Sequence, residues 1–159
     1  MKKLLLIRHA KATHEADFKD FERPLLDRGL HDAANMATRL KETGDIPQIL
    51  ISSPALRTLA TANIFSQHLN LSQAQINMDI YEASEKILVN VINSLPNEHD
   101  FIGIVGHNPG ISELLYYLAG QILEVPTCAV MLITFDTDNW AEVSFGTGHL
   151  VYYDYPKNN

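Results

Sequence analysis

The sequence has a single cysteine and no long apolar run. Because Cys128 has no second cysteine to pair with, the chain forms no internal disulfide and offers neither a cysteine-rich metal site nor a redox pair. No run approaches the roughly 20 apolar residues of a membrane-spanning helix. The apolar stretch near the N-terminus is interrupted by Arg8 and has no small-residue cleavage site, so we expect no signal peptide. We therefore expect Cys128 to be a small core residue and the protein to be cytoplasmic.

Positive charge is also scarce. Lysine and arginine number 12 against 19 aspartate and glutamate, which gives a formal net charge of -7. Such a surface repels nucleic acid and anionic lipid at long range, so we expect neither as a partner. The first strand region is an exception, because Lys2, Lys3, Arg8 and Lys11 all precede the first acidic residue. A basic spot on an acidic protein predicts a local site for an anion.

The length and the apolar pattern predict one α/β domain over residues 1–159. A chain of 159 residues, 46% of them hydrophobic, is long enough for one sizeable core and short for two. Short apolar runs typical of buried strands alternate with helical patterns, which indicates a mostly parallel sheet. Strands are expected at residues 3–7, 49–51, 76–81, 101–105, 129–135, 140–145 and 149–155. Helices are expected to start near residues 30, 54, 85 and 111.

Two histidines directly follow predicted strands. Arg8 and His9 come at the end of the strand at 3–7, and His107 comes at the end of the strand at 101–105. In open α/β sheets, ligands bind outside the carboxyl ends of the strands. We therefore expect these side chains to meet at one edge of the sheet. The alternative is that each is an isolated polar residue at the end of a strand.

Arg57 and Glu82 are further candidates at this edge. Arg57 is expected in the first turn of a helix that has Ser53 as N-cap and Pro54 at its first position. A cation at this position interacts unfavourably with the helix dipole. An anionic ligand bound between Arg57 and the helix N-terminus would offset this cost, and the alternative is that Arg57 pairs with a nearby carboxylate. Two arginines and two histidines without metal-ligand spacing favour a phosphoryl pocket over a metal site.

Three motifs, in this order, resemble those of the histidine phosphatase superfamily: Leu6-Ile7-Arg8-His9, Ser52-Ser53-Pro54-Ala55-Leu56-Arg57-Thr58 and Gly106-His107-Asn108-Pro109-Gly110. Within it, the chain is similar to the small SixA-type phosphohistidine phosphatases, because Arg23-Pro24-Leu25 and the short length also match. The resemblance runs from about Lys3 to His107 and into the C-terminal strands. It implies a phosphoglycerate mutase-like fold, which is a three-layer αβα sandwich, without a large lid subdomain.

The resemblance implies a role for each candidate residue. His9 would be the nucleophile and would form a phosphohistidine intermediate that water hydrolyses. Arg8, Arg57 and His107 would neutralise the equatorial oxygens, and Arg23 would add a contact or else be a structural residue of its loop. No cofactor or metal is implied. The chemistry of the residues agrees, because flanking arginines oppose protonation of an imidazole that must be neutral to attack.

The chain departs from the family pattern at two positions. Ala10 replaces the usual glycine after the catalytic histidine, and its methyl group would be strained if its φ were positive. Leu26 replaces the threonine that usually follows Arg-Pro-Leu, so we expect Asp27 to cap the next helix instead.

Three functions remain open at this stage. The first is hydrolysis of phosphohistidine in a protein such as a histidine phosphotransfer-type domain, since little chain between Arg57 and His107 is left to cover the groove. The second is hydrolysis of a small phosphorylated substrate, with Glu82 protonating the leaving oxygen. The third is a non-catalytic phosphate-binding module. The other histidines are expected to be surface or structural residues: His14, His31, His68, His99 and His149.

Overall fold

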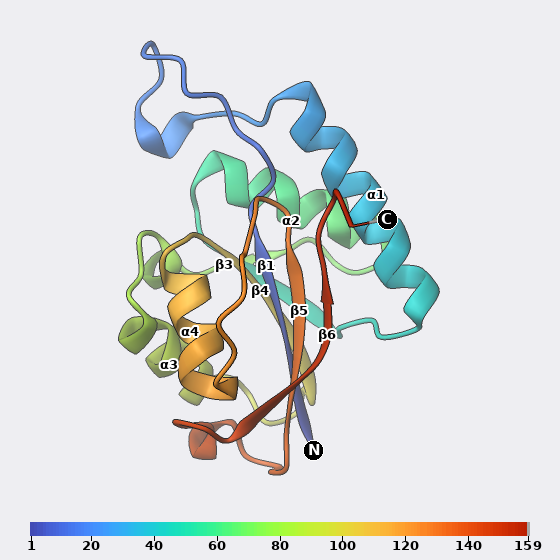
Figure 1. Ribbon diagram of the computed structural model, residues 1–159, viewed down its shortest axis with the longest axis vertical. Helices are drawn as coiled ribbons and strands as arrows, with labels where there is room; N and C mark the ends of the chain where they lie inside the picture. Colours follow the sequence, from blue (N-terminus) through green and yellow to red (C-terminus); the bar gives the residue numbers. More distant parts are fainter. Residues whose placement is uncertain (159) are drawn as a thin grey trace.

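The computed structural model describes residues 1–158 and contains a six-stranded sheet with helices on both faces (Figure 1). The strands are β1 (Lys2–Arg8), β2 (Ile49–Ser52), β3 (Gln75–Ile76), β4 (Phe101–Gly106), β5 (Val130–Phe135) and β6 (Gly148–Asp154). The helices are α1 (Asp27–Thr43), α2 (Leu56–His68), α3 (Glu85–Asn93) and α4 (Gly110–Ala119). The strand order is β3-β2-β4-β1-β5-β6, and within the described residues β5 alone runs opposite to the other five strands. The predicted mostly parallel sheet is confirmed.

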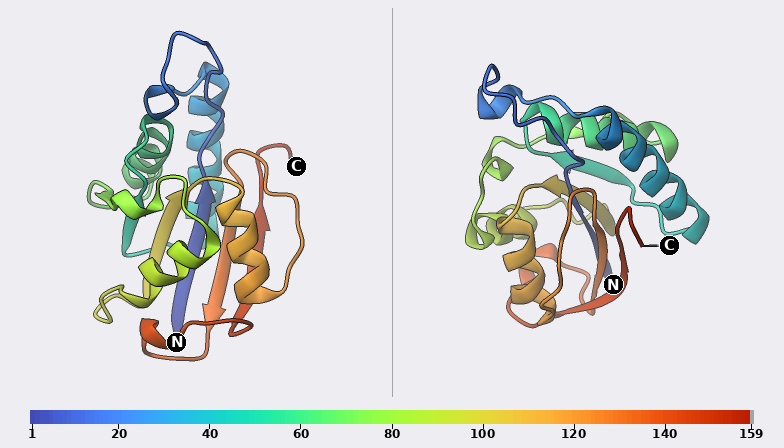
Figure 2. Two further views of the ribbon diagram at one scale, coloured as in Figure 1. Left: turned by 90° about the vertical axis from the view of Figure 1, so that its left-hand side faces the viewer. Right: turned by 45° about the horizontal axis from the view of Figure 1, so that its top comes forward.

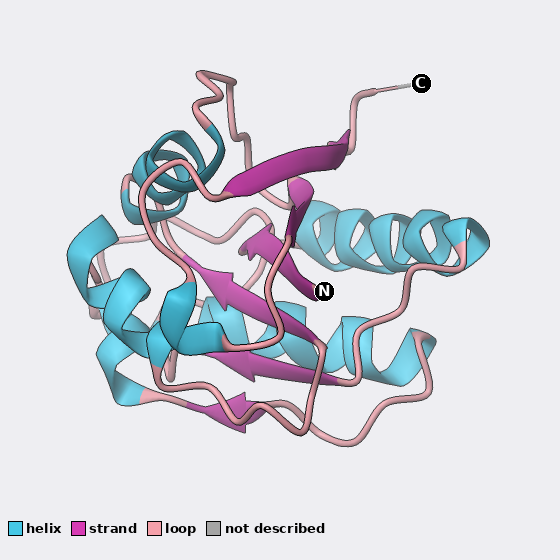
Figure 3. Cartoon of the chain, turned by 90° about the horizontal axis from the view of Figure 1, so that it is seen from below, coloured by secondary structure: helices cyan, strands magenta, loops and turns pink. Residues whose placement is uncertain are grey.

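The central strand β1 is buried on both faces, which explains its uninterrupted apolar sequence. Leu5 and Ile7 pack against the layer formed by α1 and α2, whereas Leu4 and Leu6 pack against the layer formed by α3 and α4. Figure 3 shows the helices on the two sides of the strands. The three-layer αβα sandwich is therefore confirmed. None of the helices in residues 1–158 combines the length and apolar character that crossing a membrane requires.

The strand register brings the ends of β1, β4 and β2 to one edge of the sheet. Arg8 pairs with Gly106, and Ser52 pairs with Val105. The loop from 9 to 26 extends beyond this edge, above the ends of the strands (Figure 2, left). The segments that follow the three strands therefore start side by side beneath this loop.

One strand prediction was wrong and another was wrong in part. The segment predicted as a strand at 140–145 contains no strand residue and begins with a 3₁₀ helix, Trp140–Glu142, in which the Asn139 side chain accepts a hydrogen bond from the Ala141 amide. The indole of Trp140 is fully buried and donates to the carbonyl of His99 at 2.8 Å. The strand predicted at 76–81 is limited to β3 and is followed by a 3₁₀ helix at Met78–Ile80.

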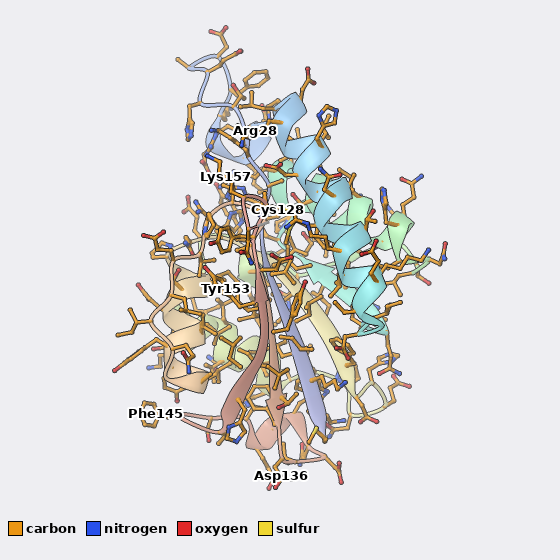
Figure 4. All side chains as sticks on the ribbon, turned by 45° about the vertical axis from the view of Figure 1, so that its right-hand side comes forward. Arg28, Cys128, Asp136, Phe145, Tyr153 and Lys157 are labelled. Carbon is orange, nitrogen blue, oxygen red and sulfur yellow. The ribbon has the colours of Figure 1, made fainter. Side chains whose placement is uncertain are left out.

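The basic spot predicted for the first strand is split between its two ends. Lys2 is buried, lies 2.8 Å from the carboxylate of Asp100 and sits over the ring of Trp140. Lys3 pairs with Asp45 at 3.2 Å. Both lysines lie at the start of β1, whereas Arg8 lies at its end. In Figure 4 the turn at Asp136 marks the lysine end of the sheet, and Cys128 lies near the other end.

Candidate active site

A cavity of about 780 Å³ opens at the edge where β1, β4 and β2 end. All six predicted site residues line it: Arg8, His9, Arg23, Arg57, Glu82 and His107. The amide of His9 donates to the carbonyl of Gly106 at 3.1 Å, which ties the end of β1 to the end of β4. The two imidazole ring centres are 5.5 Å apart. Side chains that are far apart in the sequence therefore share one cavity.

The backbone determines which nitrogen of His9 carries the proton. Nδ1 of His9 lies 2.7 Å from the carbonyl oxygen of Ala10, and a carbonyl oxygen can only accept a hydrogen bond. In the neutral ring, Nδ1 therefore carries the proton and Nε2 carries the lone pair. Nε2 has no hydrogen-bond partner among residues 1–158. The neutral His9 side chain thus presents a free lone pair.

The Arg8 side chain is held by the segment that precedes β5. Its Nη1 donates to the carbonyl of Val125 at 2.9 Å, and Asn108 donates to the same oxygen at 3.1 Å. The amide of Cys128 contacts the carbonyls of Arg8 and His9 at 3.1 and 3.0 Å. Cys128 itself is buried, as predicted, and burial raises the pKa of its thiol. The end of β1 is therefore held rigidly by the 125–128 segment.

Ser53 supports His107 and does not cap the following helix as we predicted. Helix α2 begins at Leu56 with Ala55 as its N-cap, although Arg57 does lie in the first turn. The Ser53 hydroxyl lies 2.8 Å from Nε2 of His107 and accepts a hydrogen bond from the Ala55 amide at 3.3 Å. This contact fixes the plane of the His107 ring.

Ala10 fits the site without strain. Its amide donates to the hydroxyl of Thr61 at 2.9 Å, and the same hydroxyl donates to the carbonyl of Arg57 at 2.8 Å. The φ angle of Ala10 is not positive, so its methyl group causes no backbone strain. The prediction that Asp27 caps the next helix was wrong. Asp27 is the first residue of α1, and the N-cap is Leu26, whose side chain makes no capping hydrogen bond.

The sequence did not predict two residues that contact the site, Asp20 and Tyr81. Asp20 accepts hydrogen bonds from Arg57, from Arg23 and from the hydroxyl of Tyr81, whose ring lies edge-on to His107 with centres 5.6 Å apart. Asp20 lies in a polar loop with several other acids. Nothing in the local pattern distinguishes it from them.

Glu82 lies at the rim of the cavity. It is exposed and has a φ of 52°, in the left-handed region that a residue with a Cβ seldom adopts. The loop around it packs tightly against the start of α4, since a Cβ on Gly110 would lie 2.3 Å from the carbonyl of Ala83. Glycine at position 110 therefore allows the Glu82 loop to approach the end of β4.

The imidazoles of His9 and His107, which line the cavity, are neutral at pH 7. Burial lowers the pKa of His9 to about 4, the hydrogen bond to Ala10 opposes this shift, and the positive charges of three arginines reinforce it. Burial also lowers the pKa of His107 to about 3, aided mainly by the charge of Arg57. Burial lowers the pKa of the Arg8 guanidinium as well. The cavity thus holds neutral imidazole rings next to positively charged guanidinium groups.

A pH titration tests this electrostatic arrangement. Because the neutral form of His9 persists until the pH falls to about 4, we expect its imidazole proton resonances in the ligand-free protein to titrate near that pH. An unperturbed imidazole would titrate near 6.5. His9→Asn assigns the resonances by deleting them. A midpoint between 6 and 7 for His9 would show that burial and the arginines leave the ring unshifted.

The remaining histidines lie outside the centre of the site. His31 and His149 are exposed on α1 and β6, and His68 and His99 are half-buried. His14 is exposed at the cavity rim, where its Nδ1 lies 3.3 Å from Nη2 of Arg23. Within residues 1–158, no three histidine, cysteine, aspartate or glutamate side chains gather in a way that could hold a metal ion.

Comparison with known proteins identifies relatives over most of the chain. A sequence profile of the histidine phosphatase superfamily, branch 1, matches residues 4–85, just over half of the chain. An uncharacterized chloroplastic protein of Arabidopsis thaliana is 29% identical over 154 residues, which cover 89% of this chain and 70% of that protein.

Two solved structures share the fold. The protein histidine phosphatase SixA, in complex with tungstate, is 24% identical with a TM-score of 0.85, and the match covers 98% of each chain. A mutant phosphoserine phosphatase of Entamoeba histolytica, in complex with phosphoserine, is 15% identical with a TM-score of 0.71 over 99% of this chain and 98% of that one. Together with the profile match, which includes Arg8, His9 and Arg57, these findings place the protein: the chain belongs to the histidine phosphatase superfamily.

Proposed function

We propose that the chain is a phosphatase that removes the phosphoryl group from phosphohistidine in a protein, through a covalent intermediate on His9. The observation that carries the proposal is the orientation of His9 within the cavity. The Ala10 carbonyl holds the proton on Nδ1, so that the lone pair of Nε2 is available for attack on phosphorus. A module that only binds phosphate has no use for a nucleophile held in this way.

The groups around His9 match the charge of a phosphoryl group. Arg8 and Arg57 bring two guanidinium groups to the cavity, and charge-assisted hydrogen bonds to phosphate are worth roughly 1.5–3 kcal/mol each. Nε of Arg8, Nε of Arg57 and Nδ1 of His107 are buried without a hydrogen-bond partner in the described protein. In the His107 tautomer in which the Ser53 hydroxyl donates to Nε2, Nδ1 carries the proton and is a donor toward the cavity. Phosphoryl oxygens would supply the acceptors that these three nitrogens lack.

The reaction proceeds by two displacements at phosphorus. In the first, Nε2 of His9 forms a bond to phosphorus while the bond between phosphorus and the substrate nitrogen breaks. The substrate imidazole leaves neutral, because its other ring nitrogen has taken a proton from water. In the second, water attacks phosphorus, the bond to Nε2 breaks, and His9 returns to its neutral form with the proton on Nδ1. The attacking water gives one proton to a phosphate oxygen or to solvent, and inorganic phosphate leaves. Arg8, Arg57 and His107 hold the equatorial oxygens through both steps.

A phosphorylated protein is the substrate class that the surroundings favour. The chain between Arg57 and His107 forms α2, β3, α3 and β4, which all belong to the sandwich, and leaves no subdomain in this segment to close over the cavity. A phosphorylated side chain on a protein surface can therefore reach His9. The fold match to a protein histidine phosphatase, solved with the tetrahedral oxyanion tungstate, supports this substrate class.

Hydrolysis of a small phosphate ester is the second candidate, and Glu82 is the observation that favours it. Glu82 lines the same cavity, and its positive φ is a strained conformation of the type found at functional sites. A carboxylic acid there would protonate a leaving oxygen, which an ester needs and phosphohistidine does not. The phosphoserine phosphatase that shares the fold is consistent with this reading.

Substitution of Glu82 separates the two candidates. We expect Glu82→Gln to lower hydrolysis of an alkyl phosphate, which has a poor leaving group, by about 10²-fold or more. Hydrolysis of a phosphohistidine peptide should change little, and the wild type should show its highest kcat/KM on that peptide. Steady-state kinetics on both substrates, with Glu85→Gln as a matched control, provide the measurement.

Other outcomes would redirect the proposal. A higher wild-type kcat/KM on the alkyl phosphate than on the phosphohistidine peptide would favour the small-molecule phosphatase. Equal rates for wild type and Glu82→Gln on every substrate would remove Glu82 from the mechanism. Binding of tungstate without turnover of either substrate would leave a phosphate-binding module.

A further inference from the structure

Asp20 connects three residues around the cavity, although it lies in the loop between β1 and α1. Its main-chain carbonyl accepts from Nη1 of Arg57 at 2.7 Å, and its Oδ2 accepts from Nη2 of the same residue at 3.2 Å. Its Oδ1 accepts from Nη1 of Arg23 at 2.9 Å, and Oδ2 also accepts from the hydroxyl of Tyr81 at 2.6 Å. Asp20 is therefore the centre of a polar network.

The contacts with Asp20 use one edge of the Arg57 guanidinium. A guanidinium has an end edge formed by Nη1 and Nη2, and a side edge formed by Nε and Nη2. Asp20 engages both nitrogens of the end edge. Nε is buried and has no hydrogen-bond partner in the part of the chain that the structure describes, so the side edge lacks an acceptor for Nε. A guanidinium binds two phosphate oxygens through one such edge.

Asp20 is ionised under all ordinary conditions. The hydrogen bond from Tyr81, together with Arg23 and Arg57, lowers its pKa to about 2, and the same contact raises the pKa of Tyr81 to about 12. The charged carboxylate therefore holds Arg57 throughout the working range of pH. The Tyr81 ring, fixed by this hydrogen bond, packs edge-on against His107.

We propose that Asp20 is a positioning residue, which holds the end edge of Arg57 so that its side edge is directed at the phosphoryl group. This inference rests on the proposed function, because it names the group that orients Arg57 for the same site. A misplaced guanidinium can cost about 10²-fold in rate even though its charge is still present. Asp20 thus acts through Arg57 and does not touch the reacting atoms.

A double-mutant cycle tests this coupling. Asp20→Ala removes the Oδ2 contact with Nη2 of Arg57 and keeps the main-chain contact with Nη1. We expect loss of the carboxylate to lower both kcat/KM for an aryl phosphate and the affinity for tungstate by about 10-fold or more. In the Arg57→Ala background, the same change should have an effect of about twofold or less, because the residue that Asp20 positions is absent. Asp20→Asn, which keeps a carbonyl acceptor, should recover part of the loss.

Control variants distinguish positioning from loop stability. Glu22→Ala removes a neighbouring exposed acid of the same 3₁₀ helix, Asp20–Glu22, and should leave both readouts unchanged. Tyr81→Phe removes one hydrogen bond to Asp20 but leaves its two contacts with Arg57, so it should cost less than Asp20→Ala. Thermal unfolding of each variant reports whether the fold is retained.

Three results would overturn the inference. An equal loss from Asp20→Ala in both backgrounds would show that Asp20 acts independently of Arg57, through Arg23 or through the structure of the loop. No loss in the wild-type background would show that the Asp20 carboxylate does not position Arg57. Tighter tungstate binding by Asp20→Ala would show that the carboxylate competes with the anion for Arg57. Tungstate affinity is measured by calorimetry and needs no turnover, so a failure of the proposed reaction does not obscure the result.

Discussion

Replacement of His9 with alanine is expected to abolish phosphatase turnover, with a loss of at least about 10⁴-fold in kcat. The methyl group cannot form the bond to phosphorus, so the two-step route through a phosphorylated enzyme is closed. His9 is buried but touches the cavity, and among residues 1–158 its ring makes a hydrogen bond only to the neighbouring Ala10. The fold should therefore survive. Steady-state kinetics on a phosphohistidine peptide and on an aryl phosphate give the measurement.

Trapping of the intermediate completes this test. Rapid acid-free quenching of the wild type with a radiolabelled aryl phosphate should leave label on the protein, and His9→Ala should retain none. Tungstate should still bind to the variant, because Arg8, Arg57 and His107 remain. His31→Ala, on the exposed face of α1, is the matched control and should behave as wild type. Turnover by His9→Ala within tenfold of wild type would remove His9 as the nucleophile.

Replacement of Arg57 with alanine is expected to cost about 10²–10³ in kcat, the loss typical for one donor that stabilises transition-state charge. This corresponds to about 2.7–4 kcal/mol of transition-state stabilisation. Arg57 is buried in the first turn of α2, and its Nε is a donor that has no acceptor among residues 1–158. Measurement of kcat and KM separately shows whether the interaction strengthens in the transition state.

Comparison with lysine tests whether the planar fork of Arg57 matters as well as its charge. Arg57→Lys keeps a positive charge but cannot bind two oxygens and Asp20 at once, so it should recover only part of the loss. Arg28→Ala removes an exposed arginine of α1 that pairs with Asp32 at 3.9 Å, and it should leave kcat unchanged. Full activity of Arg57→Lys would show that charge alone is sufficient at this position.

Local patterns were sufficient wherever a residue's neighbours in the sequence decided its structure. The apolar runs at Leu4–Ile7 and at Phe101–Val105 predicted buried strands, because only a strand covered on both faces is apolar without alternation. The helix expected to start near residue 85 is α3, and the Ser84 side chain caps it by accepting a hydrogen bond from the amide of Ile87. These elements need no distant partner to be recognised.

Long-range contacts decided the features that the sequence did not predict. Lys2 is buried because Asp100 and the Trp140 ring meet it there, so its charge does not contribute to the site. Ser53 lies where an N-cap was expected, but its hydroxyl contacts His107, 54 residues away. Asp20 becomes important only because the loop brings it to Arg57 and Tyr81. None of these partners is visible in a local window.

By itself, the sequence determined the αβα architecture, the positions of Arg8, His9 and His107 at the ends of strands, and the membership of a family. These features follow from hydrophobic periodicity and short motifs, which are local properties of a chain. Only the tertiary structure decided which nitrogen of His9 is free, which edge of Arg57 is occupied and which lysines are remote from the cavity. Hydrogen-bond geometry and burial depend on atoms that the fold, and not the chain order, brings together.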